Sequence, residues 1–284
     1  MLDELVCARH TVEAAFQGTH GAFSEDAALR MLPPDADLMP CSRLEHVFEA
    51  VNDGTARYGV IQVENTVAGS VHRAYDLMFQ YDLTIVAETV CRMEHTLIGL
   101  AGASIDTIQK ALSHPVALAQ CEEFFRRHES IEPVSVYDTA GAVRTIVRNG
   151  DSSCAAIASR RAADLWGGVV LAESIEDQPE NHTRFVLIAK PMEMVRPQSV
   201  DYKRTIVFRI MNEPGALCRA LLPFADRDID VAKIESRPVK GSPFEYMFYL
   251  DLVGRADYEA MYDAIEELRR QSLSVRVLGM YPRF

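Results

Sequence analysis

The sequence lacks the features that mark several classes of protein. It has no run of 18 or more apolar residues, and residues 1–18 show neither the basic start nor the apolar stretch of a secretory signal. The six cysteines are scattered without a C-x-x-C pair, and the histidines show no H-E-x-x-H spacing. We therefore expect a cytoplasmic protein with no membrane partner, no disulfide framework and no metal.

Nucleotide-binding loops and an excess of basic residues are missing as well. Gly18 and Gly21 lack the third glycine of the dinucleotide fingerprint, and no G-x-x-x-x-G-K-[ST] loop is present. The chain has 29 Lys+Arg against 41 Asp+Glu, a net charge of -12, whereas nucleic-acid binding needs basic patches. We expect no cofactor and no nucleic-acid partner.

The chain does have the composition of a globular protein with about two domains. It holds 284 residues, of which 48% are hydrophobic. Apolar periodicity is lost between 191 and 203, where Pro191 and Pro197 stand, so we predict domains at 1–190 and 204–284 joined by a linker at 191–203. Residues 204–284 contain 12 basic and 12 acidic residues, so the negative charge belongs to the first part.

The two parts show different patterns of strands and helices. The second part reads as β-α-β-β-α-β, the ferredoxin-like motif, with segments 203–211, 214–228, 229–239, 244–253, 256–270 and 275–281. In the first part, strands are expected at 13–17, 58–64, 83–90, 96–100, 133–138, 154–159 and 183–189. Helices are expected between them at 26–32, 72–79, 116–128, 140–148 and 160–166. The first part is therefore an α/β domain.

Four strand-to-helix junctions of the first part carry small or capping residues. They are 18–24, 64–70, 113–115 and 138–139. Helix N-termini present unpaired N–H groups and a partial positive charge, so several that meet in one cleft can hold a small carboxylate. The alternative is that these residues only cap helices and allow tight turns.

Polar residues at these junctions are the candidates for chemistry. Glu64, Asn65 and Thr66 end a strand, where they either bind substrate or complete a turn. Ser113 precedes His114, for which a local structural role is the alternative to catalysis. Gln120 lies on an otherwise apolar helix, either buried with a partner or on an exposed face.

The triplet Thr183, Arg184 and Phe185 begins the last strand of the first part. An arginine can hold a carboxylate through two parallel hydrogen bonds, and an adjacent threonine can donate a proton or a hydrogen bond. The alternative is that Thr183 and Phe185 simply favour a strand and that Arg184 lies on the surface.

Taken in order, these segments resemble the prephenate dehydratase family. The resemblance rests on GTHGAFSEDAA (18–28), GVIQVENTVAGSV (59–71), SHPVALAQC (113–121), DTAGA (138–142), AAIASRRAA (155–163) and ESIEDQPENHTRF (173–185). The segment 214–238 resembles the ACT regulatory domain of the same family. Nearly the entire chain is covered.

The resemblance implies a fold, a reaction and a set of residue roles. The fold is a two-subdomain unit like that of periplasmic solute-binding proteins (type 2), with the active site in the cleft, followed by the ACT domain. The reaction removes water and carbon dioxide from prephenate, gives phenylpyruvate for phenylalanine biosynthesis and needs no cofactor. Thr183 matches the essential threonine of the family, with Arg184 as carboxylate binder and Asn65, Ser113 and Gln120 as polar groups of the cleft.

The resemblance of the second part implies regulation by phenylalanine. The matching effector motifs are Gly215, Ala216 and Leu217, and Glu235, Ser236, Arg237 and Pro238. Without the resemblance, 235–238 would be a strand end with a surface ion pair. ACT domains usually pair side by side, which implies a homodimer or homotetramer.

Other functions stay open at this point. The segment 69–78 resembles plant arogenate dehydratases, so arogenate is an alternative substrate. A non-catalytic amino-acid sensor is the alternative from a different class. Because the first part is acidic and the expected substrate is an anion, binding must depend on short-range contacts, for which Arg184 and helix N-termini are the candidates.

Overall fold

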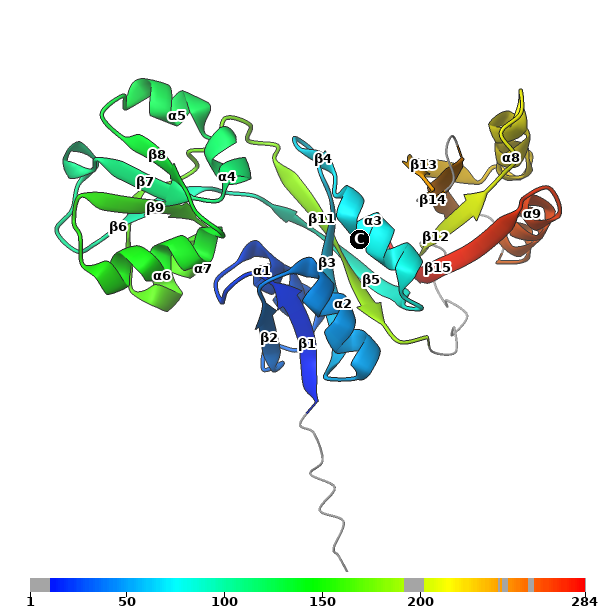
Figure 1. The fold of residues 1–284 in the computed structure, drawn as a ribbon, viewed down its shortest axis with the longest axis horizontal. Helices are drawn as coiled ribbons and strands as arrows, with labels where there is room; N and C mark the ends of the chain where they lie inside the picture. The colour runs from blue at the N-terminus through cyan, green and yellow to red at the C-terminus, as the bar shows by residue number, and fades with distance from the viewer. Residues whose placement is uncertain (1–10, 192–201, 240, 242–244, 255–257, 284) are drawn as a thin grey trace, which may run out of the picture. The chain divides into compact units, whose positions relative to one another are not determined.

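The computed structural model describes residues 11–191, 202–239, 241, 245–254 and 258–283 (Figure 1). Its residues form two compact units. Of the described residues, the first unit contains those up to Ala74 together with Thr89–Leu187, and the second contains Tyr75–Glu88 together with those from Ile188 onward. The predicted linker at 191–203 lies almost entirely outside the described residues, so the predicted division stays a prediction.

The first unit contains two sheets. One follows the order β5-β11-β3-β1-β2, with β4 added to β3, and β1 is parallel to both β2 and β3. Residues 84–88 of β5 and 188–189 of β11 belong to the second unit. The other has the order β10-β6-β9-β7-β8 and mixes parallel and antiparallel pairs. The strands are β1 (Val12–Gln17), β2 (Leu38–Cys41), β3 (Ala56–Asn65), β4 (Gly69–Ser70), β5 (Thr84–Arg92), β6 (Thr96–Gly99), β7 (Lys110–Ser113), β8 (Glu132–Ser135), β9 (Cys154–Ala158), β10 (Val169–Ala172) and β11 (His182–Ala189). The α/β prediction is confirmed.

Helices connect these strands, and on the second sheet they lie on both faces (Figure 1). They are α1 (Phe23–Met31), α2 (Leu44–Asp53), α3 (His72–Gln80), α4 (Pro115–Ala119), α5 (Glu122–Arg127), α6 (Thr139–Asn149) and α7 (Arg160–Trp166), with a short 3₁₀ turn at Ile105–Thr107. The N-caps of α6 and α7 are Asp138 and Ser159, and both helices end at a glycine with positive φ, Gly150 and Gly167. Such caps satisfy the unpaired groups at helix ends.

The single helix predicted at 116–128 is wrong, because two helices occupy that segment. The carboxylate of Asp177 accepts hydrogen bonds from the N–H groups of Glu122 and Glu123, both at 2.9 Å. It thereby satisfies the first N–H groups of α5 and lets a second helix begin there. Gln120 consequently becomes the C-cap of α4 rather than an interior helical residue.

The second unit contains the predicted β-α-β-β-α-β order. Its elements are β12 (Tyr202–Arg209), α8 (Ala216–Ala225), β13 (Asp230–Pro238), β14 (Tyr246–Gly254), α9 (Tyr258–Arg270) and β15 (Ser274–Pro282). The antiparallel sheet has the order β13-β14-β12-β15, and both helices pack against it around Ile206, Phe224 and Leu268. The ferredoxin-like prediction is confirmed.

The segment Tyr75–Glu88 packs within the second unit although it lies far away in sequence. Tyr249 Oη donates to the carbonyl oxygen of Tyr75 at 2.8 Å, and Arg276 donates to the carbonyl oxygens of Tyr81 and Leu83 at 2.7 and 3.2 Å. Gly279 pairs with Ile85, whose carbonyl oxygen leaves no room for a Cβ. These contacts explain why the unit includes 75–88.

Within the described part of the chain, no helix is both long enough and apolar enough to cross a membrane.

Candidate functional site

A cavity of about 370 Å³ lies within the first unit. Residues from all four predicted junctions line it, among them Gly18, Asn65, His114 and Asp138. This volume lies at the lower end of the range usual for small-molecule sites, about 300 to 1,000 Å³. The structure therefore brings the four predicted junctions together at one cavity.

The N-terminus of α1 opens into this cavity. The helix begins at Phe23, and Ala22, Phe23 and Ser24 all line the cavity. The first N–H groups of a helix have no partner inside the helix, and the N-cap residue Ala22 has no side-chain acceptor to satisfy them. The α1 end therefore presents N–H donors and partial positive charge to whatever occupies the cavity.

The N-terminus of α6 reaches the same cavity but is closed by its own cap. Asp138 accepts a hydrogen bond from the Gly141 N–H, and its Oδ2 accepts from Thr19 Oγ1 at 2.9 Å. Asp138 and Thr139 line the cavity. Among the described residues that line it, Asp138 is the single Asp, Glu, Lys or Arg.

Asn65 and Thr183 form a buried polar pair at the cavity. Asn65 is 4% exposed and Thr183 1% exposed, and Asn65 Nδ2 donates to Thr183 Oγ1 at 2.9 Å. Asn65 Oδ1 accepts from the N–H groups of Val67 and Ala68 at 3.0 and 2.7 Å. Asn65 thus fixes both the turn that follows β3 and the hydroxyl oxygen of Thr183.

A second polar pair, His95 and Gln120, lines the cavity. His95 is 3% exposed, and its Nε2 lies 2.8 Å from Gln120 Oε1. Burial lowers the pKa of His95, although the hydrogen bond with Gln120 and the charge of Glu176 oppose the shift. His95 is therefore neutral near pH 7, and its Nδ1 has no hydrogen-bond partner among the described residues.

His95 was not among the residues predicted from the sequence. Its position in the sequence offered one signal, a histidine between the apolar strand β5 and the fully buried strand β6. Gln120 was predicted, and its side chain reaches the cavity because α4 ends there.

His114 is the N-cap of α4 and lines the cavity. Its Nδ1 accepts from the Val116 N–H at 3.2 Å, so the neutral ring carries its proton on Nε2. Burial lowers the pKa of His114, and the charge of Asp138 opposes the shift. His114 therefore has the structural role that was one of the two alternatives, as the cap of α4, and it also lines the cavity.

Glu64 and Arg184 are not among the described residues that line the cavity, and for Arg184 the reason is that side chains alternate along a strand. Thr183 and Phe185 of β11 line the cavity, whereas Arg184 does not; it pairs with Glu64 of β3, Arg184 Nη1 lying 3.8 Å from Glu64 Oε2. The side chain of Arg184 is 12% exposed. This geometry does not support Arg184 as a direct carboxylate ligand.

Thr66 and Ser113 are also absent from the described residues that line the cavity. Thr66 Oγ1 donates to the Glu180 carbonyl oxygen and accepts from the His182 N–H, both at 2.9 Å. Ser113 is fully buried, and its Oγ donates to the carbonyl oxygen of Ile157 at 2.6 Å. Both hydroxyls hold the backbone.

Metal-ligating side chains do not cluster in the described part of the chain. No group of three or more His, Cys, Asp or Glu side chains lies close enough there to hold a metal ion.

The predicted effector residues lie in the second unit. Gly215 has φ of +79° and is the N-cap of α8, and Ala216 and Leu217 line a cavity of about 100 Å³ with Tyr246 and Phe248. Tyr246 and Phe248 belong to β14, and on the adjacent strand β13 Ser236 pairs with Phe248 and Pro238 with Tyr246. The two motifs therefore approach each other through β14.

Arg237 of the second motif forms an ion pair, as the alternative for 235–238 predicted, but with Asp76 and with both side chains largely buried rather than on the surface. Its Nη2 lies 3.2 Å from Asp76 Oδ1, and the two side chains are 19% and 16% exposed. Asp76 belongs to the segment Tyr75–Glu88 of the same unit. Glu235 lies on the same strand, β13, with its side chain half-buried.

Models of known protein families match both parts of the chain. The prephenate dehydratase family model matches residues 14–193, and the ACT domain model matches residues 204–270. Arogenate dehydratase/prephenate dehydratase 2, chloroplastic, of Arabidopsis thaliana is 36% identical over 99% of this chain and 75% of its own length. Arogenate dehydratase 1 of Petunia hybrida is 39% identical over 96% of this chain and 67% of its own length.

Solved structures match over the same extent. The prephenate dehydratase of Arthrobacter aurescens in complex with L-Phe has a TM-score of 0.87 and 31% identity, with 96% of this chain and 90% of that chain covered. GqqA, described as a novel type of quorum quenching acylase, has a TM-score of 0.87 and 32% identity over 95% of this chain and 98% of its own. The predicted fold class, a two-subdomain α/β unit followed by an ACT domain, is confirmed.

Proposed function

Because the chain belongs to the prephenate dehydratase family, we propose that it removes water and carbon dioxide from prephenate and so forms phenylpyruvate for phenylalanine biosynthesis. The observation that supports this most is one cavity lined by both the Thr183 hydroxyl and the open α1 end. These are the two kinds of group that the reaction needs.

The chemistry requires a donor to the leaving hydroxyl. When the ring carboxylate leaves as carbon dioxide, its bonding electrons enter the ring, the hydroxyl departs with a proton, and the ring becomes aromatic. A threonine hydroxyl is a poor free acid, but the Asn65 N–H that donates to Thr183 Oγ1 strengthens the Thr183 proton as a donor. Thr183 is thus the proposed donor, and Asn65 keeps it oriented.

The substrate carboxylates require partners as well. The Phe23 and Ser24 N–H groups at the α1 end can bind one without a cationic side chain. His114 Nε2–H and the side-chain NH₂ of Gln120 are further donors at the cavity, while Phe23, Met93 and Phe185 offer apolar surface to the ring. Short-range dipoles thus offset the negative charge of the first part.

Arogenate is the second candidate substrate, and Asp138 is the observation that favours it. Arogenate carries an amino group where prephenate carries a carbonyl, and Asp138 is the single carboxylate among the described residues lining the cavity. An ammonium group near Asp138 would gain a favourable charge interaction. The names of the relatives include both activities.

Phenylalanine is the proposed effector, and a homo-oligomer is the proposed assembly. The L-Phe complex of the Arthrobacter aurescens protein supports this effector class. The cavity beside Ala216 and Leu217 is only about 100 Å³, smaller than the usual lower limit of about 300 Å³ for a ligand site. Apolar side chains exposed in the same unit, Met211, Leu222, Tyr246 and Leu273, suit coverage by a second copy. A cytoplasmic location remains a prediction.

Parallel assays of the purified full chain test the proposal. Prephenate and arogenate are supplied separately, with and without phenylalanine, and phenylpyruvate and phenylalanine are quantified as products. Turnover of either substrate supports a dehydratase, and inhibition or activation by added phenylalanine supports the effector. Binding of both substrates without turnover would instead support the amino-acid sensor.

A further inference from the structure

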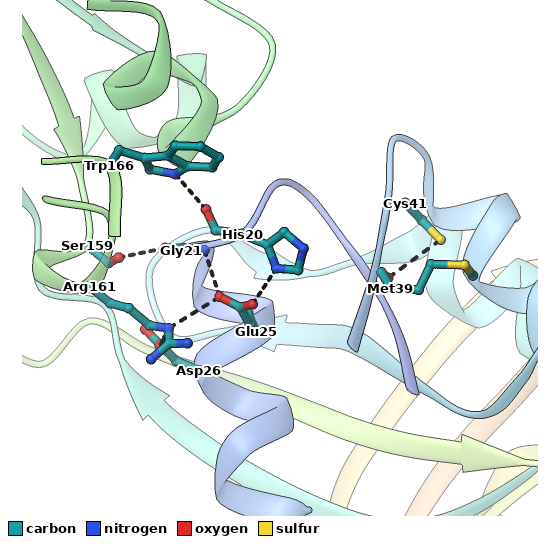
Figure 2. A network of polar contacts seen from close by, with 9 residues as sticks. All are labelled: His20, Gly21, Glu25, Asp26, Met39, Cys41, Ser159, Arg161 and Trp166. Atoms are coloured by element: carbon teal, nitrogen blue, oxygen red, sulfur yellow. Dashed lines mark hydrogen bonds and ion pairs between the residues drawn. The ribbon is translucent and has the colours of Figure 1, made fainter. Parts of the chain in front are cut away.

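The backbone of the loop between β1 and α1 (residues 18–22) accepts hydrogen bonds from α7 and from its N-cap residue (Figure 2). Trp166 Nε1 donates to the carbonyl oxygen of His20 at 2.9 Å, and Ser159 Oγ donates to the carbonyl oxygen of Gly21 at 2.7 Å. These two carbonyls belong to consecutive residues of the loop. Two side chains about 140 positions away in sequence therefore fix one short stretch of backbone.

Glu25 holds the same stretch from the side of α1. Its side chain is 6% exposed; Oε2 accepts from the Gly21 N–H at 2.7 Å, and Oε1 lies 2.6 Å from His20 Nδ1. Arg161 of α7 also reaches Glu25, with Nε 3.2 Å from Oε2. Burial alone would raise the pKa of Glu25, but the hydrogen bonds from His20, Gly21 and Arg161 outweigh it and lower the pKa. Glu25 is thus an ionised acceptor.

Gly21 lets this loop lie directly against α7. Its φ is +92°, and a Cβ built there would lie 2.9 Å from the Ala162 Cα. Both the backbone conformation and the close approach to Ala162 require glycine. The contact is therefore one of backbone against backbone, reinforced by Ser159 and Trp166.

The opposite side of the same loop faces the cavity. Gly18, Ala22, Phe23 and Ser24 line the cavity, whereas Glu25, Ser159 and Trp166 are not among its described lining residues. The α1 end is therefore separated from the Trp166 and Ser159 hydrogen bonds by only the short stretch from His20 to Ala22.

We infer that Glu25, Ser159 and Trp166 are positioning residues for the reaction: they hold the His20–Gly21 backbone against α7 and thereby place the α1 end where it binds a substrate carboxylate. The inference rests on the proposed function, which assigns a carboxylate to the α1 end. Because Thr183 is held separately by Asn65, loosening this contact should weaken substrate binding and leave the chemical step intact.

Trp166→Phe is the sharpest test, because it keeps an aromatic ring and removes the N–H. One hydrogen bond of ordinary net strength corresponds to about a fivefold change in an equilibrium constant. We expect KM to rise about fivefold, with kcat within about twofold of wild type. Glu25→Gln should act in the same direction, because the amide replaces one of the two acceptor oxygens of the carboxylate with an NH₂ group, which cannot accept a hydrogen bond.

Leu165→Ala is the matched control, since Leu165 is an exposed residue of α7 that takes no part in the contact. Ser159 also caps α7, so Ser159→Ala is compared with Ser159→Thr, which retains the hydroxyl and should restore KM. Thermal unfolding is recorded for every variant. A merely structural role would lower the folded fraction, and hence the apparent kcat, without changing KM.

Two results separate the inference from the proposed function. If the wild type turns over neither prephenate nor arogenate, the proposed function fails. Whether these residues hold the His20–Gly21 backbone is then tested by hydrogen exchange alone. The Gly21 amide should exchange faster in Trp166→Phe than in wild type and Leu165→Ala. An unchanged KM in folded Trp166→Phe and Glu25→Gln, or an unchanged Gly21 exchange rate where no turnover exists, overturns the inference.

Discussion

The N-termini of α1 and α6 reach the same cavity and differ in how their N–H groups are satisfied. At α6, Asp138 caps the helix and also accepts from Thr19. At α1, the N-cap is Ala22, which offers no side-chain acceptor. An alanine at this position makes a helix less stable than Ser, Thr, Asp or Asn by about 1 kcal/mol.

This difference indicates what each helix end does. The α6 end is completed by the chain itself and supports the cavity wall, whereas the α1 end is left incomplete for a ligand. An open end is useful only if it is held in place, and the contacts of Glu25, Ser159 and Trp166 with the preceding loop supply that support. The predictions below test this division of roles, starting with the largest effect.

Removing the Thr183 hydroxyl should give the largest loss of activity. This loss shows what damage to the chemical step looks like, and the effects on binding are compared with it. Thr183→Ala should lower kcat by about a thousandfold, the scale expected for loss of a positioned donor, while KM changes little. Thr183→Ser retains the hydroxyl and should recover much of the activity. Steady-state kinetics with prephenate checks this, and an active, folded Thr183→Ala would contradict the role of Thr183.

Closing the open helix end should damage binding rather than chemistry. Ala22→Asp places a carboxylate where the substrate carboxylate is proposed to bind, so KM should rise at least about tenfold through competition and charge repulsion. The same change should stabilise the fold by about 1 kcal/mol, because it caps α1. Urea unfolding and kinetics on one preparation measure both effects. Ala22→Ser, a neutral cap, is the control and should raise KM less.

Changing the closed helix end should affect substrate choice. Asp138→Asn keeps an effective cap but removes the charge, so the ratio of kcat/KM for prephenate to that for arogenate should rise about fivefold, the equivalent of about 1 kcal/mol. Competition assays with mixed substrates measure this ratio. An unchanged ratio would show that Asp138 does not face the amino group of arogenate.

The smallest effect on activity is expected at Asp26, in the first turn of α1, where only stability should change. Burial raises the pKa of Asp26 to about 6, although the charge of Arg161 opposes the shift. The folded state thus binds a proton more readily than the unfolded state, and the contribution of Asp26 to stability falls as the pH rises from about 4 to about 6.

Asp26→Asn should remove this loss. Relative to wild type, the variant should gain about 1 to 3 kcal/mol between pH 4 and pH 7, with KM unchanged because Asp26 does not line the cavity. Urea unfolding at several pH values checks the sign. A stability difference between variant and wild type that stays constant or falls as the pH rises from 4 to 7 would contradict the burial argument.

Much of the fold could be predicted from the sequence because periodicity and caps are local properties. Asp138 before α6 and the β-α-β-β-α-β order of the second unit are examples. The helix α2 was not predicted, although Leu44, Val47 and Val51 on its buried face form a helical pattern. The short strand β2, by contrast, contains Pro40 and could not be identified from alternation.

The candidate site could be predicted only in part, because its geometry depends on contacts distant in sequence. The alternation along β11 could have separated Thr183 from Arg184, since neighbouring residues of a strand face opposite ways. The break of the helix at Gln120 could not be foreseen, because it depends on the Asp177 carboxylate more than 50 positions away. The same holds for the pairing of His95 with Gln120.

The most direct measurement is a crystal structure of Thr183→Ala with prephenate bound, since that variant should bind the substrate without consuming it. The account predicts one carboxylate within hydrogen-bond distance of the Phe23 and Ser24 N–H groups, and the ring hydroxyl beside the position of the missing Thr183 Oγ. A substrate whose carboxylates contact Arg184, with the α1 end left empty, would contradict it.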